Sequence, residues 1–216
     1  MKLYGYFRSS AAFRVRIALN IKELNYNHLP IHLTRHGGEQ RQESFLTINP
    51  SGLVPVLEDN DNFLSQSLAI IEYLEELYPK PSLLPGTPIG RAQIRSIAMA
   101  IACDIHPLNN LRVLKYLEHD MGHDKTKIMQ GWYQHWLQIG FNALEKTLKQ
   151  TRKDSTFCFG HKPTLADVAL IPQMYNARRF NFVLDAFPTL VSIEKACLML
   201  PSFQKALPEN QPDYDQ

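Results

Sequence analysis

The sequence contains little cysteine, and its cysteines are scattered. The three of them, Cys103, Cys158 and Cys197, stand far apart without a CxxC pair, and an odd number cannot pair completely. This usage is typical of a reducing compartment and gives no signature of a redox pair. The eight histidines show no HExxH string or other paired ligand spacing. We therefore predict no metal site.

Long apolar runs are also missing. No stretch approaches the roughly 18 consecutive apolar residues of a membrane span. The N-terminal residues MKLYGYFRSS lack the apolar core of a secretion signal. From these two absences we expect a soluble, cytoplasmic protein with no membrane association.

Neither sign of charge dominates the composition. Lys and Arg number 23 against 21 Asp and Glu, a net charge of +2. So small an excess argues against a nucleic-acid partner, which would need a clustered basic face. The strings GxGxxG, GxSxG and the P-loop are absent as well, which weakens dinucleotide-binding, hydrolase and kinase functions.

The chain does have enough apolar sequence for a sizeable core, and it has one clear interruption. Its 216 residues, 44% of them hydrophobic, correspond to one or two domains. Between Pro79 and Pro88 four prolines and a glycine exclude a continuous helix or a central strand. We therefore place a linker here, between a domain of residues 1–84 and a domain of residues 89–216.

Before the linker, strand-like runs alternate with helical patterns. In the first helix Phe13 and Ile17 recur at helical spacing, with Arg14 and Arg16 off that stripe. The order βαβ then ββα predicts a four-stranded mixed sheet. The predicted strands are 3–7, 27–33, 54–57 and 63–64, and the predicted helices are 11–24 and 67–78. In the second helix we expect Ile70, Leu74 and Leu77 to point inward, and Glu72, Glu75 and Glu76 outward.

After the linker the pattern is helical throughout. A long helix over 90–117 is expected to bend or break at Pro107, and a second helix covers 126–149. Thr164 and Asp167 form a capping box that starts a third helix, and a fourth covers 189–200. The Pro-, Asn- and Asp-rich end from Pro208 is predicted to be a tail.

Ser9 and Ser10 stand at a strand-to-helix junction. Serine is a favoured N-cap residue, which by itself explains the pair. The N-terminus of a helix also attracts anions, and a serine hydroxyl beside it could stabilise a thiolate. No cysteine lies in this stretch, so such a thiol would have to come from a ligand.

At two further junctions the residues have either a purely structural role or a role in binding a ligand. A proline at the start of a strand, such as Pro55, often only marks the edge of a sheet. A cis Val54–Pro55 bond would instead expose the Val54 backbone to a peptide-like ligand. Gln66 and Ser67 precede a helix, where they either form a simple cap or bind a carboxylate.

The domain after the linker offers weaker signals. His106 to Arg112 form a polar stretch where a helix must bend, so a surface kink and a ligand site are both open. Arg178 and Arg179 end a helix, where cations commonly offset the helix dipole. Trp132 and Trp136 have the spacing of core residues rather than of a ligand platform.

Taken together, these strings resemble the zeta-class glutathione transferases nearly from end to end. The strings YFRSS, RVRIAL and QSLAIIEYLEE are specific to that class, whereas the Val-Pro turn and the capping box are shared across the wider superfamily. The full set comprises YFRSSAAFRVRIALN, NPSGLVPVL, QSLAIIEYLEELYP, LLP in the linker, IHPLNNLRVL and TLADVALIPQMYNARRF.

The resemblance implies an α/β thioredoxin-like N-terminal domain, an all-α C-terminal domain and a homodimer with glutathione bound between the domains. Ser9 matches the family's thiol-stabilising serine, and Ser10 and Arg14 match residues that support it, so these three are the expected catalytic residues. Arg8 and Arg179 match basic positions expected near the carboxylates of a substrate. The expected glutathione-binding residues are Ser9, Ser10, Ala11, Ala12, Phe13, Arg14, Gln40, Val54, Pro55, Gln66, Ser67, His106, Asn110, Leu111 and Arg112.

The activity implied by the resemblance is the isomerisation of maleylacetoacetate to fumarylacetoacetate in tyrosine and phenylalanine breakdown, by reversible addition of glutathione thiolate. Isomerisation of maleylpyruvate and general conjugation by a detoxifying transferase are the alternatives among enzymes. From another class, the fold could serve as a non-catalytic interaction scaffold. Paired arginines favour a small dicarboxylate substrate.

Two positions depart from the family pattern. The common string at the first helix is SSC, and Ala11 occupies its third position. A mechanism based on a protein thiol is therefore excluded there, while isomerisation by glutathione thiolate does not need that cysteine. His106 stands where some family members carry glutamine, which leaves its proton chemistry open.

Overall fold

The computed structural model describes residues 1–152 and 154–214, and their contacts divide the chain into two compact units. The first unit comprises Met1–Leu83 together with the residues from Leu198 onward, and the second comprises Leu84–Cys197. The sequence-based boundaries of the two domains stay a prediction. The contact-based division differs from them because it assigns the residues after Cys197 to the first unit.

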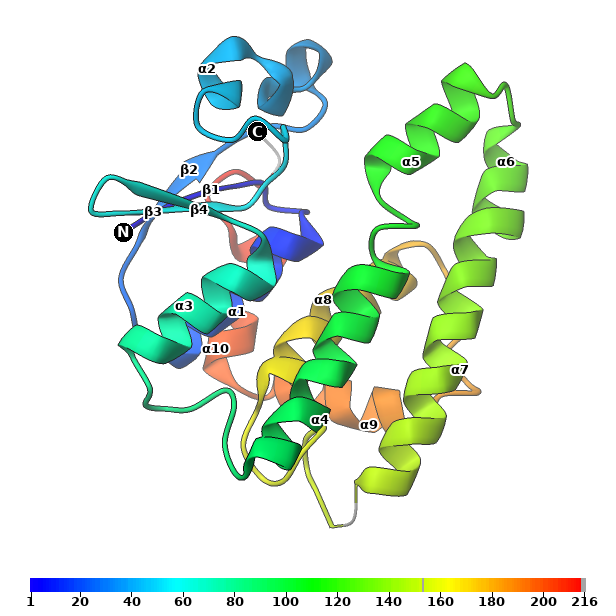
Figure 1. Cartoon of the computed structure of the whole chain (residues 1–216). Coiled ribbons are helices and arrows are strands. Elements are labelled where there is room, and N and C mark those ends of the chain that lie inside the picture. Colours follow the sequence, from blue (N-terminus) through cyan, green and yellow to red (C-terminus); the bar gives the residue numbers. More distant parts are fainter. Residues whose placement is uncertain (153, 215–216) are drawn as a thin grey trace. The chain divides into compact units, whose positions relative to one another are not determined.

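A mixed four-stranded sheet forms the centre of the first unit, as predicted (Figure 1). Its order is β2-β1-β3-β4, with β1 parallel to β2 and the other pairs antiparallel. Leu3 pairs with Leu57 across the centre, and both side chains are fully buried. The strands are β1 (Lys2–Gly5), β2 (Asn27–Pro30), β3 (Val56–Asp59) and β4 (Asn62–Ser65).

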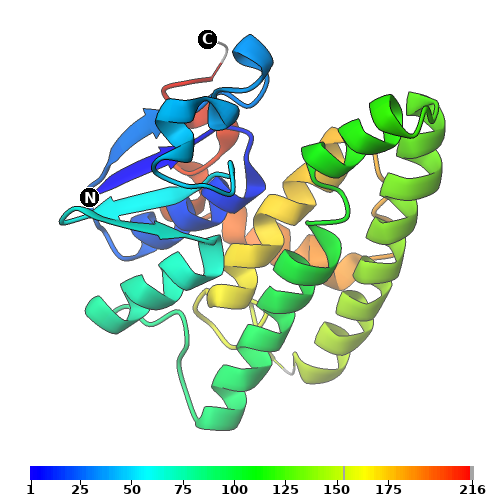
Figure 2. The same ribbon diagram turned by 45° about the horizontal axis from the view of Figure 1, so that its top comes forward.

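Two helices pack together on one side of this sheet, and short helical turns lie on the other (Figures 1 and 2). The packed pair is α1 (Ser10–Ile21) and α3 (Ser67–Leu77). The opposite side carries α2 (Glu43–Leu46) and 3-10 turns at Arg35–Gly37 and Glu39–Arg41. The α/β layering therefore confirms the thioredoxin-like domain that the sequence predicts.

The burial of charged residues in these helices differs from the prediction. Arg14 and Arg16 are buried in α1, although they stand off its apolar stripe. In α3 Glu75 is buried and Leu77 is half exposed, the reverse of the expected orientation. Burial of charged groups requires partners, and the periodicity of the sequence does not show where those partners are.

The partners of Glu75 lie at the end of α1 and at the start of the linker. Its carboxylate accepts from Lys22 Nζ at 2.7 Å, from Ser82 Oγ at 2.5 Å and from the Leu83 N–H at 3.0 Å. The same ammonium group donates to the Tyr78 carbonyl oxygen at 2.6 Å and to that of Pro81 at 3.2 Å. Burial opposes ionisation of Glu75, but the bonds from Leu83, Lys22 and Ser82 outweigh it and lower its pKa.

The second unit is helical, in agreement with the prediction of an all-α domain (Figure 2). Regular helix ends before Pro107, as predicted, and resumes at Leu111. Three stretches within these helices are π-helical, a local widening that is frequent at functional sites. The α-helices are α4 (Pro88–Met99), α5 (Leu111–Lys115), α6 (Lys125–Lys127), α7 (Gln134–Thr151), α8 (Leu165–Arg179) and α9 (Pro188–Leu198), and the π-helices are Ala100–Ile105, Tyr116–Asp120 and Ile128–Tyr133.

The predicted capping box at the start of α8 is present. The Asp167 carboxylate accepts from the Thr164 N–H at 2.8 Å and from the Thr164 hydroxyl at 2.9 Å. It also accepts from the Cys158 N–H at 2.8 Å, so it joins the preceding loop to the helix. All three residues are buried, and the box therefore fixes the start of the central helix of this unit.

Residues 201–214, which we call the C-terminal segment, belong to the first unit. It begins with α10 (Pro201–Gln204), which contacts α1, and continues through a 3-10 turn at Pro208–Asn210. Phe203 and Ala206 are fully buried, and the side chain of Asp213 is buried as well. The expectation of a tail from Pro208 is therefore wrong, because these residues pack against partners that lie about 200 positions earlier in the chain.

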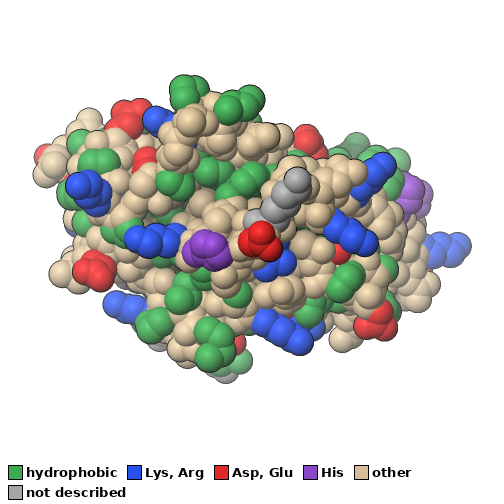
Figure 3. All heavy atoms as spheres, turned by 90° about the horizontal axis from the view of Figure 1, so that it is seen from below, with side chains coloured by type: hydrophobic (Ala, Val, Ile, Leu, Met, Phe, Trp, Pro, Cys, Tyr) green, Lys and Arg blue, Asp and Glu red, His purple; other side chains and the backbone are tan. Residues whose placement is uncertain are grey.

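None of the described helices is long and apolar enough to cross a membrane. On the face drawn in Figure 3, Lys and Arg side chains are spread between Asp, Glu and apolar side chains.

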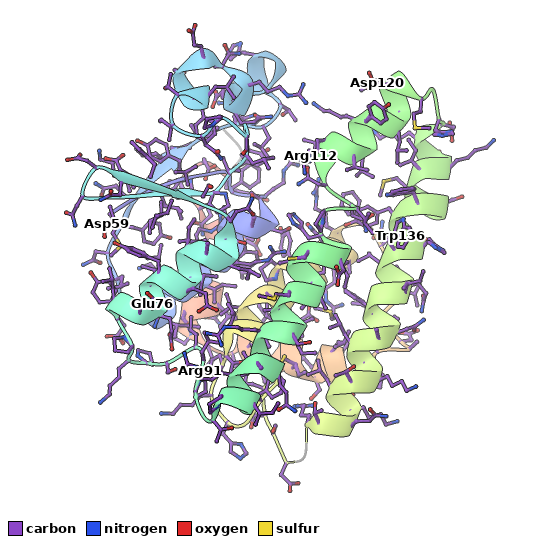
Figure 4. All side chains as sticks on the ribbon, in the orientation of Figure 1. Asp59, Glu76, Arg91, Arg112, Asp120 and Trp136 are labelled. Carbon is purple, nitrogen blue, oxygen red and sulfur yellow. The ribbon has the colours of Figure 1, made fainter. Side chains whose placement is uncertain are left out.

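Glu75→Ala should lower the free energy of unfolding by about 3–5 kcal/mol, because Lys22 would stay buried without its carboxylate. Since the pKa of Glu75 is lowered, this contribution is complete above the ordinary carboxyl pKa of 4.5 and is lost as pH falls through the lowered value. Urea unfolding at neutral and acidic pH measures the difference from wild type, which should shrink below pH 4.5. The control is Glu76→Ala at the exposed neighbouring position (Figure 4), for which we expect a change within about 0.5 kcal/mol. Equal losses in both variants would contradict the prediction.

Gly140→Ala should destabilise the second unit by about 1–3 kcal/mol, because a Cβ atom there would lie 2.3 Å from Ile105 Cδ1. The matched control is Gly131→Ala, where no described atom lies within 4 Å of the added Cβ. There the higher helix propensity of alanine should leave stability unchanged or raise it by up to about 1 kcal/mol. The two variants are compared by their midpoints of urea unfolding. Equal midpoints would refute the close approach of α7 to the π-helix Ala100–Ile105.

Candidate functional site

The turn between β1 and α1 carries the predicted serine. Ser9 is the N-cap of α1, and its Oγ accepts from the Ala12 N–H at 3.2 Å. Its own N–H donates to the Tyr6 carbonyl oxygen at 2.9 Å, which closes the turn of residues 6–9. The interpretation of Ser9 as the N-cap residue of the first helix is thus confirmed. A hydroxyl has one proton to donate while it accepts, so capping leaves Ser9 able to donate to an anion.

The electrostatics of this helix start favour a negative ligand. The first turn of α1 contains no acidic residue, so no carboxylate of that turn neutralises the partial positive charge of the helix N-terminus. Such an end stabilises thiolates, carboxylates and phosphates. The turn can therefore lower the pKa of a thiol placed against it.

A buried arginine joins this helix start to the second predicted one. Arg14 Nη1 donates to Ser67 Oγ at 3.2 Å, and both side chains are buried. Ser67 is the first residue of α3, and Gln66 before it is exposed and has a left-handed φ of 69°. A non-glycine residue in that conformation costs about 1–3 kcal/mol and is common where a ligand is bound. The structure thus brings together Arg14 and Ser67, two residues that the sequence predicts in one site.

The remaining predicted residues of the first unit lie in two loops that meet. The Val54–Pro55 peptide is cis, the form that the sequence left open. A Cβ atom on the neighbouring Gly52, where φ is +60°, would lie 3.1 Å from the Gln40 carbonyl oxygen, so the two loops are in contact. The Gln40 side chain is buried, and its Oε1 has no hydrogen-bond partner among the described residues. An unsatisfied buried amide oxygen is suited to a ligand that donates to it.

Between Ser10 and Arg14 the prediction includes three apolar residues of α1, and two of them are core residues. The side chains of Ala12 and Phe13 are buried, and their N–H groups are bonded to Ser9 Oγ and to the Ser9 carbonyl oxygen. Contact between a ligand and these two residues stays a prediction that their packing does not favour. Ala11 is only partly buried.

In the second unit the predicted residues follow the first π-helix. His106 is partly buried and directly follows that helix. Asn110 is the N-cap of α5, with Oδ1 accepting from the Arg112 N–H at 3.1 Å. Leu111 and Arg112 are exposed in the first turn of that helix, where Figure 4 labels Arg112. The structure therefore groups this stretch at one break between helices of the same unit.

The two arginines at the end of α8 are distinct. The Arg178 guanidinium donates from Nε to both oxygens of the buried Glu194 carboxylate, at 2.8 Å and 3.0 Å. Arg179 is exposed, and its guanidinium carbon lies 4.7 Å from the centre of the Phe180 ring. The Arg178 charge is thus paired with the Glu194 carboxylate, and Arg179 stays the arginine predicted to bind an anionic ligand.

Sequence reasoning missed two buried polar groups of the second unit, on Tyr133 and Asn109. The Tyr133 hydroxyl is buried, has no hydrogen-bond partner among the described residues, and its ring lies 4.5 Å from that of Phe180. Burial raises its pKa strongly, and the positive charge of Arg179 offsets part of this rise. Asn109 donates to the Tyr133 carbonyl oxygen at 3.2 Å, and its own Oδ1 is buried without a described partner. Asn109 stands next to a predicted residue, but no sequence signal distinguishes Tyr133 from core aromatics.

The two tryptophans around Tyr133 are less buried than the prediction of core residues requires. Both are partly exposed, and their rings meet edge to face at 5.8 Å. Trp132 Nε1 donates to the Leu108 carbonyl oxygen at 2.8 Å, so it fixes the turn before α5. Figure 4 labels Trp136 on α7.

Comparison with known proteins identifies the relatives of this chain. Residues 3–82 match the N-terminal domain of glutathione S-transferases. A probable maleylacetoacetate isomerase of Vibrio cholerae is 51% identical, with 98% of this chain and 97% of that protein covered. Both chains are thus covered almost completely.

Solved structures agree with this result. The holo structure of a maleylpyruvate isomerase, described as a bacterial zeta-class glutathione S-transferase, has a TM-score of 0.95 at 43% identity and 99% coverage of both chains. A maleylacetoacetate isomerase of Methylobacterium extorquens with bound malonate and glutathione has a TM-score of 0.94 at 38% identity and 100% coverage of both chains. Identity at this level over whole chains, together with the sheet, the Ser9 turn and the helical second unit, confirms the resemblance seen in the sequence. This chain belongs to the glutathione S-transferase family, in its zeta class.

Proposed function

We propose that this protein is a glutathione-dependent cis–trans isomerase that converts maleylacetoacetate to fumarylacetoacetate in tyrosine and phenylalanine breakdown. The observation that carries the proposal is the position of Ser9, a serine N-cap at a helix start without acidic residues and without a cysteine. This arrangement suits the thiolate of a ligand rather than a thiol of the protein.

The groups of the first unit fit glutathione as that ligand. Glutathione carries one thiol and two carboxylates, and the unit offers two helix starts joined by the bond between Arg14 and Ser67. The buried Gln40 Oε1 needs a donor, which a peptide N–H or an ammonium group provides. We assign Gln40, Val54, Gln66 and Ser67 to the peptide part of glutathione, and Ser9 to its sulfur.

When bound, glutathione supplies a thiol whose reversible addition to the cis double bond turns it into a rotatable single bond. Ser9 donates its hydroxyl proton in a hydrogen bond to the sulfur anion, and the N-terminus of α1 adds its partial charge. Arg14 orients Ser67 and, with Ser10, supports the first turn of the helix. Arg8 and Arg179 bind the carboxylates of the substrate and stabilise the negative charge that develops next to them.

Maleylpyruvate is the second candidate substrate, favoured by the similarity to a maleylpyruvate isomerase over the whole chain. Both substrates combine a cis-enoic acid with a keto group, so the same thiol chemistry serves both. The ratio of their kcat/KM values decides between them. General conjugation is a third activity of the same thiolate, which a chlorinated aromatic substrate measures.

We also propose that the protein acts as a homodimer in the cytoplasm. Sedimentation of the purified protein tests the dimer, and fractionation of cells tests the location.

The test of the proposed function is the loss of maleylacetoacetate absorbance, coupled to fumarylacetoacetase, with maleylpyruvate assayed in parallel. Turnover that requires glutathione supports the isomerase. Absence of turnover with both substrates, together with conjugation of a chlorinated aromatic, would replace it by a detoxifying transferase.

Ser9→Ala should lower kcat about 10- to 100-fold, since it removes one hydrogen bond to an anion worth about 1.5–3 kcal/mol. The pKa of the bound thiol should rise toward its ordinary value of about 8.5, which the ultraviolet absorbance of the thiolate reports. Ser9→Asp separates this effect from the loss of the cap, because aspartate is also a good N-cap but repels the thiolate. It should keep the melting temperature and lose activity. Ser9→Ala with turnover within about threefold of wild type would remove the assigned role of the serine.

Arg179→Met should lower kcat/KM for the dicarboxylate substrate about 10- to 100-fold, because a guanidinium–carboxylate bond is worth about 1.5–3 kcal/mol. Conjugation of an uncharged substrate should change less than about threefold, which distinguishes lost carboxylate binding from lost folding. The control is the neighbouring Arg178→Met, which breaks the ion pair with Glu194. It should lower stability and leave kcat/KM for the dicarboxylate near the wild-type value. Equal kcat/KM losses in both variants would contradict the assignment.

A further inference from the structure

We propose that Asp213, near the end of the C-terminal segment, is a positioning residue for the site: it fixes the turn of residues 6–9 and thereby the places of Arg8 and Ser9. The inference rests on the proposed function for what the turn does, and on contacts within the first unit for how the turn is fixed.

The direct contact is a hydrogen bond to the backbone of the turn. Asp213 Oδ2 accepts from the Phe7 N–H at 2.9 Å, and the aspartate is only 4% exposed. Phe7 stands two residues before Ser9, and the Ser9 N–H closes the same turn on the Tyr6 carbonyl oxygen. A shift of the Phe7 peptide therefore moves the start of α1.

The other side of the Phe7 residue is fixed by a buried arginine. Arg16 Nη2 donates to the Phe7 carbonyl oxygen at 2.9 Å and to the Ala206 carbonyl oxygen at 3.0 Å. Its Nη1 donates to the Tyr6 carbonyl oxygen at 3.4 Å. The guanidinium is thus shared between the turn and the C-terminal segment. The Phe7 N–H is therefore bonded to Asp213, which belongs to the C-terminal segment. The Phe7 carbonyl oxygen is bonded to Arg16, which also donates to that segment.

The Asp213 carboxylate is charged and is itself fixed in place. His28 Nε2 from β2 lies 3.0 Å from Asp213 Oδ1, and both side chains are nearly buried. Burial opposes ionisation of Asp213, but the contacts with His28 and with the Phe7 N–H outweigh it and lower its pKa. A charged acceptor bonds to an N–H about twice as strongly as a neutral one.

Aromatic contacts extend the same arrangement to Arg8. The Tyr214 ring meets the Phe7 ring edge to face at 5.5 Å. Arg8 packs over the rings of Phe7 and Tyr6, and its Nη2 donates to the Tyr6 hydroxyl at 2.8 Å. The C-terminal segment therefore contacts the residue on which the Arg8 side chain packs, and this side chain is the one assigned to a substrate carboxylate.

The test compares Asp213→Ala and Asp213→Asn with the matched control Asp61→Asn, an aspartate exposed in the β3–β4 hairpin of the same unit. In Asp213→Ala we expect kcat to fall about 10-fold or more while KM for glutathione stays within about threefold, because a misplaced turn affects the sulfur more than the peptide contacts at Gln66 and Ser67. Asp213→Asn retains an oxygen that can accept from Phe7, and we expect a loss of about threefold. The control should match the wild type.

A second readout needs no ligand and no turnover. Hydrogen exchange of the free protein should be about 10-fold faster in Asp213→Ala for the amides of residues 7–12 and unchanged in the β3–β4 hairpin. If wild type does not isomerise either substrate, the proposed function fails, and this exchange result still decides whether Asp213 fixes the turn. A folded Asp213→Ala with wild-type exchange, or with faster exchange but wild-type kcat, would overturn the positioning role. Should Asp213→Ala not fold, wild-type values of kcat and exchange in Asp213→Asn would overturn it equally.

Discussion

A fully buried guanidinium has to be satisfied by hydrogen bonds, and Arg16 is such a group in this protein. Its acceptors are backbone carbonyl oxygens from two distant stretches, the turn after β1 and the C-terminal segment. Removing either stretch would leave a charge in the core without its partners, at a cost of several kcal/mol. The conformation of the Ser9 turn and the packing of the C-terminal segment therefore depend on each other, because both satisfy the same guanidinium.

The same physical rule organises the other end of the first helix pair. Lys22 and Glu75 are buried together, and their remaining hydrogen-bonding capacity is used by the backbone of residues 78–83. Buried charges thus fix both ends of α1, while apolar side chains fill the space between them. Among the described residues, polar groups without a partner remain at Tyr133 and Asn109 in the second unit and at Gln40 in the first. Buried charges that have partners fix the fold, whereas unsatisfied polar groups of this kind are suited to a ligand.

Local patterns predicted most of the architecture. The patterns that predict the strands, the break before α5 and the capping box of α8 each lie within a few positions of sequence, and the structure confirms the sheet, the break and the box. The inward position of Arg16 could not be predicted in this way, because the groups that satisfy it lie up to 190 residues away. Glu75 and Asp213 were misplaced for the same reason. The resemblance to a known class supplied the residues of the site, while the buried Tyr133 hydroxyl, which has no hydrogen-bond partner among the described residues, follows only from packing.

The distance along the chain between the Ser9 turn and its partners has a consequence for the order in which the protein is made. Strands, helices and the β3–β4 hairpin of the first unit can pair as soon as residues 1–83 have been synthesised. The turn that starts α1 lacks the Ala206 carbonyl oxygen and the Asp213 carboxylate until residues 206–213 emerge from the ribosome. A nascent chain can therefore contain a formed sheet and an unfinished anion-binding turn. Maturation of this turn therefore depends on residues that are synthesised about 200 positions after it.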